Sequence, residues 1–354
     1  MNGLEYLDRL RHESGYYDHL AFFDDKALED IRDIAAKEGV DVAEFPKTVQ
    51  ELRNKIGHAM LVWNQMKPIM QRHPRFDGKD VLVGDIRGLG FDACALHAPN
   101  GDRLILVDLD LKMTLVALGQ LLMEAAFAIM DEQQGHAPRT IVFDDQSMNV
   151  DVPFIISMLL AYTSHFVTDE RNPHIEPARE LLRRHPYSPP GCRPSAKQEG
   201  TFFNGVVTCF VLAHELAHHL LDHVGTGAVQ IIKDGTVNWK AIQRSHDQEH
   251  QADRLGMELF LLCADDHRGY PAFSAINRQW WMAVPLFFKL MEIARAIRRT
   301  SESALSTHPS PIKRLQRVED ELLRRYRNHP GRSAYEVLRD HVLEPTLKIA
   351  RMPE

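Results

Sequence analysis

The stretch VLAHELAHHLLDH, residues 211–223, decides how the rest of this sequence is interpreted. It places four histidines among aliphatic residues, and His214, Glu215 and His218 form the pattern H-E-x-x-H. On a helix, residues four apart share a face, so His214 and His218 can reach one cation together. Glu215 is rotated by about 100° from His214, which lets its carboxylate address a metal-bound water instead of the metal. Zinc lowers the pKa of such a water to roughly 7, and a glutamate can accept its proton during attack on a peptide carbonyl.

The surroundings of this motif are more informative than the motif itself. A chain with 19 histidines in 354 residues contains H-E-x-x-H by chance in roughly 6% of cases. Here, however, apolar residues surround the motif and predict a buried helix over about 201–224. Buried histidines need polar partners, because unpaired buried polar groups are costly. The apolar residues are Val206, Val207, Phe210, Val211, Ala213, Leu216, Ala217 and Leu220.

A third ligand is expected further along the chain, because a catalytic zinc usually takes three protein ligands and keeps one position open. Glu249 and Asp253 are four residues apart at the start of a second predicted helix, over about 240–264. We expect Glu249 to complete a His/His/Glu site. Asp253 would then hydrogen-bond the far nitrogen of a liganding histidine and fix its tautomer. The alternative is an acidic helix N-terminus that the helix dipole stabilises.

Other residues near the motif are weaker candidates for the third ligand. His223 lies five residues beyond His218 and would face away by about 140° if the helix continued. Asp222 could accept a hydrogen bond or act as a helix-end charge. His246 and His250 are expected on the surface.

Composition and charge exclude several functional classes. A net charge of −7 gives no reason to expect binding to nucleic acid. The N-terminus lacks an apolar signal core, and polar or charged residues interrupt the longest apolar runs, 115–130 and 280–297. We therefore expect no membrane span and a cytoplasmic protein. The sequence carries no signal for an oligomeric state.

The four cysteines are scattered and contain no C-x-x-C pair, which agrees with a reducing compartment. Cys192 lies in the loop PPGCRPS, before the predicted metal-binding helix. A thiol there could ligate the metal and keep an enzyme latent, although an exposed loop cysteine is the simpler expectation.

The patterns along the chain predict an α+β protein that is predominantly helical. Residues 1–80 form an N-terminal helical layer, with helices expected at 27–39 and 48–66. Residues 81–330 form the metal-binding domain, with a helical and proline-rich insertion at about 112–200, and 331–354 form a C-terminal helical tail. Asn100-Gly101 between two apolar runs predicts a β-hairpin, part of a small sheet beside the H-E-x-x-H helix. Six prolines between 169 and 200 predict an irregular connection.

Three motifs in this order resemble the HtpX-like gluzincin metallopeptidases, the group that also includes the CAAX prenyl proteases. The first is H-E-x-x-H, and the second is E-x-x-A-D, matched from Glu249 to Asp253. The third is a late T-H-P-x-x-x-x-R-[IL] segment, matched by Thr307, His308, Pro309, Arg314 and Leu315. The hairpin sequence FDACALHAPNGDRLILV, residues 91–107, is also similar in pattern to the segment before the family's metal-binding helix.

The resemblance implies a zincin (gluzincin) core and a Zn²⁺-dependent endopeptidase. An edge strand, near 92–97 or 104–107, would pair with a protein or peptide substrate in extended form. His308 would approach the metal, as an occluding ligand or as a stabiliser of the oxyanion, or would simply form a turn before the last helices. Arg314 would hold the surrounding carboxylates.

The chain also departs from the family. About 90 residues separate the hairpin from the metal-binding helix, the gap between His218 and Glu249 is short, and the family's transmembrane segments are missing. We therefore do not expect membrane-protein substrates.

The leading interpretation is a soluble zinc metalloendopeptidase with Glu215 as general base. One alternative is a zinc-stabilised regulatory or binding protein. Another is a highly selective protease that acts on one cellular target, in stress or phage defence.

Overall fold

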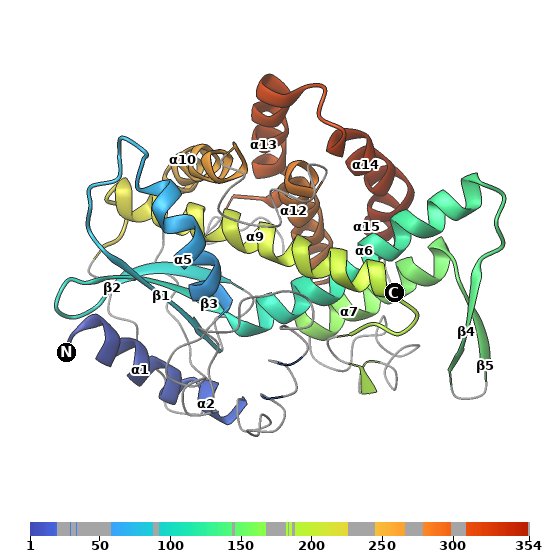
Figure 1. Cartoon of the computed structure of the whole chain (residues 1–354), viewed down its shortest axis with the longest axis horizontal. Helices are drawn as coiled ribbons and strands as arrows, with labels where there is room; N and C mark the ends of the chain where they lie inside the picture. Colours follow the sequence, from blue (N-terminus) through green and yellow to red (C-terminus); the bar gives the residue numbers. More distant parts are fainter. Residues whose placement is uncertain are drawn as a thin grey trace.

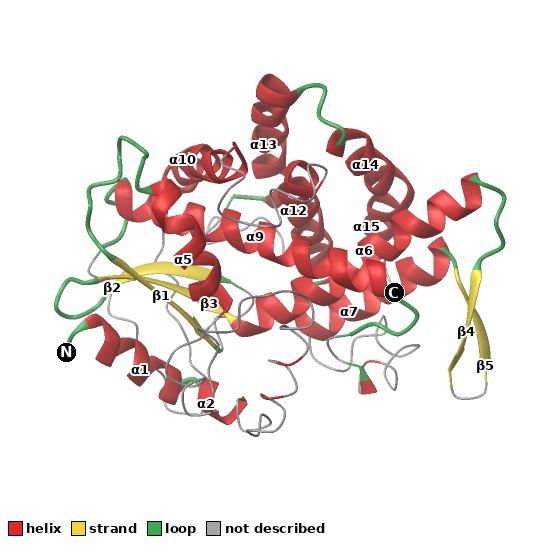
Figure 2. Cartoon of the chain, viewed as in Figure 1, coloured by secondary structure: helices red, strands yellow, loops and turns green. Residues whose placement is uncertain are grey.

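The fold is that of a computed structural model. The residues that the structure describes are 1–19, 29, 33, 58–87, 92–143, 146–167, 182, 184–185, 188–225, 245–265, 279–298 and 309–352. These residues form a mostly helical molecule with two small sheets (Figure 1; Figure 2), which confirms the predicted predominantly helical α+β class. Of the predicted helix at 27–39 only residues 29 and 33 are described, and the start of the one at 48–66 lies outside the described residues.

Along the chain, the three strands of the first sheet precede helix α6 (Leu109–Gln133), the two strands of the second sheet follow it, and the remaining elements are helices. The helices are α1 (Gly3–Glu13), α2 (Tyr16–His19), α5 (His58–Met70), α6 (Leu109–Gln133), α7 (Val152–Val167), α9 (Pro194–Leu220), α10 (His246–Asp265), α12 (Gln279–Ile297), α13 (Pro311–Tyr326), α14 (Gly331–Leu338) and α15 (Glu344–Ala350), with a π-helical segment at Arg339–Leu343. The strands are β1 (Val81–Ile86), β2 (Ala93–His97), β3 (Arg103–Asp108), β4 (Arg139–Phe143) and β5 (Gln146–Val150).

The first sheet contains the predicted hairpin. Strands β2 and β3 pair antiparallel, and their turn is closed by a 2.8 Å hydrogen bond from the Ala98 N–H to the Asp102 carbonyl. Gly101 has a φ of 89°, which explains why a glycine follows the asparagine. Strand β1 joins parallel to β3, so the order is β1-β3-β2. Of the two strands that the sequence offers as a substrate-binding edge, β2 is an edge strand and β3 is central.

The two faces of this sheet are covered by different helices. Helix α1 lies along one face, and α5 and α9 lie on the other (Figure 1). The side chains alternate accordingly, since successive residues of a strand point to opposite faces. Leu96, Leu104 and Leu106 join Leu7 of α1, whereas Ala95 points into the main core.

Helix α9 is the central helix of the main core. It is 27 residues long, and α6 packs along it closely because Gly119 and Gly200 bring the two backbones together: a Cβ on Gly119 would lie 2.9 Å from the Gly200 carbonyl oxygen. Helices α6 and α9 are both long and apolar enough to cross a membrane by length and composition, but 67% and 89% of the relevant windows are buried inside the protein.

Two parts of the predicted insertion differ from expectation. Residues 139–150 contain a second hairpin, β4–β5, which projects from the helical body at the end opposite the first sheet (Figure 2). The proline-rich connection also becomes helical earlier than predicted, because α9 begins at Pro194. Proline suits the first turn of a helix, where its missing N–H has no intrahelical partner.

Candidate metal centre

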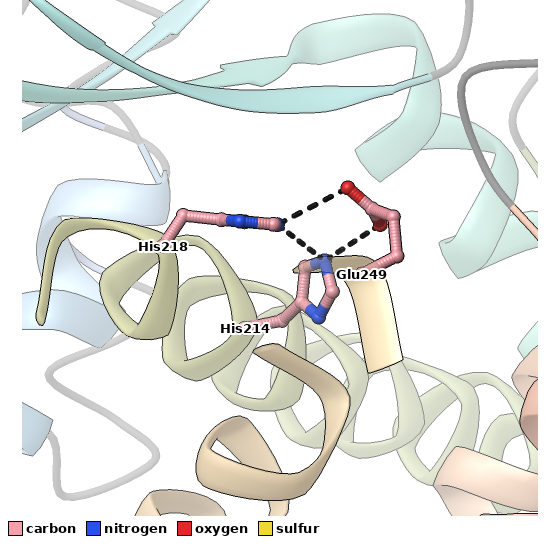
Figure 3. Close-up of side chains that lie close together, drawn as sticks. All are labelled: His214, His218 and Glu249. Atoms are coloured by element: carbon pink, nitrogen blue, oxygen red, sulfur yellow. Dashed lines mark hydrogen bonds and ion pairs between the residues drawn. The ribbon is translucent and has the colours of Figure 1, made fainter. Parts of the chain in front are cut away.

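Helices α9 and α10 bring His214, His218 and Glu249 together in the core (Figure 3). The Nε2 atoms of the two histidines are 3.2 Å apart. The Glu249 carboxylate faces both, with one oxygen 3.4 Å from His214 Nε2 and the other 3.3 Å from His218 Nε2. All three side chains are buried, and one potential ligand atom from each lies within 4.8 Å of the others. This group could hold a metal ion.

The start of α10 presents Glu249 to the histidines. Ser245 and Gln248 form a reciprocal cap: the Gln248 N–H donates to Ser245 Oγ at 3.2 Å, and the Ser245 N–H donates to Gln248 Oε1 at 2.9 Å. This cap fixes the first turn of the helix, where the dipole favours the negative charge of Glu249.

Gly256 sets the spacing between the two helices. A Cβ at this position would lie 2.8 Å from the Cα of His214 and 3.0 Å from its backbone nitrogen. Only glycine allows so close a crossing. It occurs at the first histidine, so it determines how near the residues of α10 come to both imidazoles.

The outer nitrogen of His214 contacts Asp253, as predicted, with 3.1 Å between Nδ1 and Oδ1. Arg314 of α13 holds Asp253 through two nitrogens, with Nη2 2.6 Å from Oδ1 and Nε 2.9 Å from Oδ2. The guanidinium carbon of Arg314 lies 4.9 Å from the ring centre of Phe288. Asp253 therefore contacts the outer nitrogen of a candidate ligand histidine, and Arg314 holds a carboxylate beside it, as the sequence suggested.

The charges around His214 shift the pKa values of the group. Burial opposes a charged imidazolium, yet the hydrogen bonds to Asp253 and Glu249 outweigh it and raise the pKa of His214 to about 9. Burial also opposes ionisation of Asp253, but Arg314 and His214 hold the pKa of that carboxyl far below its usual range. Asp253 therefore stays ionised at every physiological pH.

The outer nitrogen of His218 contacts His223, contrary to the prediction that His223 faces away. Their Nδ1 atoms are 3.2 Å apart, and His223 Nε2 is 3.3 Å from Gln251 Oε1. The prediction fails because α9 ends at Leu220 and Asp222 takes a left-handed φ of 58°. The chain reverses there, and the His223 N–H donates to the His218 carbonyl at 2.9 Å.

Glu215, the predicted general base, lies between the histidines and the first sheet. It is 2% exposed, and its Oε2 accepts a 2.7 Å hydrogen bond from the backbone N–H of Ala95 in β2. Its Oε1 lies 3.9 Å from His214 Nε2. One carboxylate oxygen is therefore bound to the edge strand while the other is directed towards the candidate ligands.

The remaining candidates lie away from the group or beyond the described residues. His246 and Asp222 are exposed, and His250 is half-buried. His219 points to the sheet, with Nε2 2.9 Å from the Leu104 carbonyl oxygen. His308, expected from the resemblance to approach the metal, lies outside the described residues.

Cys192 cannot ligate a metal at this group. It precedes α9, and about 30 Å of helix separate Pro194 from His214 at 1.5 Å per residue. Its thiol is also buried, which raises its pKa to about 12, instead of lying exposed in a loop. The structure thus contradicts both the latency hypothesis and the simpler expectation for this cysteine.

The comparisons with known proteins do not assign the chain. Comparisons with models of protein families, with characterised proteins and with solved structures found no match. The likeness to the HtpX-like gluzincins therefore remains a resemblance in the three motifs.

Proposed function

We propose that this chain is a zinc-dependent endopeptidase built on a gluzincin-type core. The observation that carries the proposal is the convergence of His214, His218 and Glu249, with Glu215 directly beside them. A carboxylate that is not a ligand but is directed at the ligand set is what metal-assisted peptide hydrolysis requires.

The donor set favours zinc over other divalent ions. Two imidazole nitrogens and one carboxylate are a common catalytic zinc set, whereas magnesium and calcium prefer oxygen ligands alone. Structural zinc sites usually use four protein ligands, and the group found among the described residues has three. A site with one position left for water or substrate supports catalysis over a purely structural role.

When bound, zinc would polarise the scissile carbonyl and make a water molecule more acidic. Glu215 is the proton acceptor in this scheme, and its burial keeps bulk water from competing for the carboxylate. The Ala95 N–H holds one of its oxygens, so the side chain has a fixed direction before substrate arrives. Fixing a catalytic group in this way reduces the entropy lost on reaching the transition state.

Asp253 and Arg314 orient the first histidine. The Asp253 carboxylate accepts a hydrogen bond from the Nδ1–H of His214, which leaves the Nε2 lone pair for the metal. Arg314 in turn fixes the carboxylate with two hydrogen bonds, so the histidine, the aspartate and the arginine act as one rigid unit.

The proposed substrate is an extended peptide that pairs with the outer edge of β2. This edge lies beside Glu215, and strand addition uses main-chain hydrogen bonds with little dependence on sequence. The outward N–H of Ala93 donates to Asp92 Oδ1 at 2.8 Å, so a bound peptide would compete with Asp92 for this donor, while the Ala95 N–H stays on Glu215.

The test is Glu215→Gln compared with Glu258→Gln, a half-buried glutamate of α10 that contacts His73 and Arg254 instead of the ligands. Purified protein is incubated with zinc and an unstructured substrate such as casein, and a proteomic peptide library covers a selective enzyme. We expect Glu215→Gln to bind zinc normally and to lose cleavage by about 10²- to 10⁴-fold, because the proton acceptor is gone. Full cleavage by Glu215→Gln would refute the mechanism.

A further inference from the structure

We propose that His223 and Gln251 form a hydrogen-bond chain that fixes the tautomer of His218 for metal binding. The inference rests on the metal centre of the proposed function but not on its peptidase chemistry. His223 lies beyond the H-E-x-x-H motif, and Gln251 occupies a variable position of E-x-x-A-D, so neither motif specifies this contact.

The geometry of His218 requires a proton on one nitrogen only. Its Nε2 faces His214 Nε2 at 3.2 Å and the Glu249 carboxylate at 3.3 Å. To bind a cation there, Nε2 must carry a lone pair, so the proton of the neutral ring must be on Nδ1. A buried N–H at Nδ1 needs an acceptor.

His223 provides that acceptor when its own proton is on Nε2. Its Nδ1 lies 3.2 Å from His218 Nδ1, and its Nε2 lies 3.3 Å from Gln251 Oε1. The structure places the amide oxygen of Gln251 against this nitrogen, and that oxygen is an acceptor only, so this arrangement pairs with the Nε2–H form of His223. The proton order along the chain is then Nδ1–H of His218 to Nδ1 of His223, and Nε2–H of His223 to Gln251.

The local fold is built to make this contact. The left-handed φ of 58° at Asp222 ends the helix, and the bond from the His223 N–H to the His218 carbonyl places the second ring beside the first. Gln251 comes from α10, two residues beyond Glu249, so the same helix supplies a ligand and the end of the chain. The two ligand histidines thus have different outer partners, the ionised Asp253 for His214 and the imidazole of His223 for His218.

The experiment measures zinc affinity by competition with a chelator, using the full-length protein with His223→Ala, His223→Asn and the control His246→Ala. Loss of a group that orients a ligand typically weakens metal binding 10–100-fold, and we expect this for His223→Ala. Asn has an amide oxygen that can accept the same proton, so His223→Asn should recover part of the loss. The exposed His246 precedes Glu249 on the same helix, and its removal should leave the affinity within about twofold.

A second measurement reads the tautomer without metal. The ¹⁵N shifts of the histidine rings, recorded for the metal-free protein at a pH where the rings are neutral, should show part of the His218 population protonated on Nδ1, although the Glu249 carboxylate 3.3 Å from Nε2 competes for the proton. This fraction should fall in His223→Ala. Unchanged zinc affinity together with an unchanged tautomer in His223→Ala would overturn the inference. A wild-type protein that binds no zinc would instead refute the proposed function, and the tautomer would still decide this inference.

Discussion

The substitution Gly256→Ala tests whether the close crossing of α9 and α10 creates the metal centre. The added Cβ would lie 2.8 Å from the Cα of His214, 3.0 Å from its nitrogen and 3.3 Å from the carbonyl carbon of Ala213. All three are backbone atoms of a buried helix, so no side chain can rotate to make room.

The size of the effect follows from these distances. Carbon atoms make ordinary contact at about 3.5–4.0 Å, so the helices must separate by on the order of 1 Å. Glu249 lies about two turns from Gly256 on the same rigid helix, and its carboxylate moves with it. Metal sites tolerate errors of only about 0.2 Å in ligand distances. Loss of a residue that orients a metal ligand typically weakens metal binding about 10–100-fold, and we expect a loss of at least about tenfold in zinc affinity here. Overpacking should also lower the free energy of unfolding of the metal-free protein by about 1–3 kcal/mol, partly offset by the better helix propensity of alanine.

The assay is zinc affinity by chelator competition, with thermal unfolding of the metal-free protein recorded in parallel. Gly225→Ala is the matched control, because a Cβ at Gly225 would meet nothing within 4 Å. Wild-type affinity and stability in Gly256→Ala would show that the crossing does not set the ligand geometry, and the reasoning would be wrong.

Three further predictions follow from the site. Arg314→Lys keeps the positive charge but loses the two-pronged contact with Asp253, so zinc binding should weaken roughly tenfold, as measured by the same competition; an unchanged value would mean that charge alone suffices. Because the pKa of His214 in the metal-free protein is raised from 6.5 to about 9, protonation stabilises that state at low pH and this stabilisation is lost as the pH rises through 9. Zinc must displace the proton, so its affinity should rise by up to about tenfold per pH unit between pH 7 and 9, and titration calorimetry in two buffers should detect the released proton; pH-independent binding would contradict this. Ala95→Pro removes the N–H that donates to Glu215 without removing a hydrogen bond between β2 and β3. It should lower kcat by about 10²-fold while the zinc content stays normal. A change in KM alone would argue against a role of the Ala95 N–H in positioning Glu215.

Much of the site could be predicted from the sequence because helical spacing is regular. Residues four apart on one helix share a face, and this relation holds for His214 with His218 and for Glu249 with Asp253. The Asn-Gly turn likewise predicts the β2–β3 hairpin, since few residue pairs suit its backbone. These features depend on local geometry that the fold does not alter.

The rest depends on where elements end and how they cross. The prediction for His223 assumed that α9 continues, whereas the left-handed turn at Asp222 reverses the chain and brings the ring back to His218. Gly256 inside a predicted helix was a signal of close packing, but its partner helix could not be read from the sequence. The Ala95 N–H is a backbone group and leaves no trace in the residue type. The hairpin β4–β5 was missed because two five-residue strands are short against the helices that flank them.

The most direct test of the account is the zinc content of the wild-type protein and of Glu249→Ala, measured by elemental analysis after dialysis against limiting free zinc. Glu249 is fully buried and faces both histidines, so its loss removes one of the three proposed ligands. The account predicts one zinc per chain in the wild type and a nearly zinc-free Glu249→Ala that remains folded. Equal zinc content in the two proteins would contradict it and would show that the metal, if bound at His214 and His218, has a different third ligand.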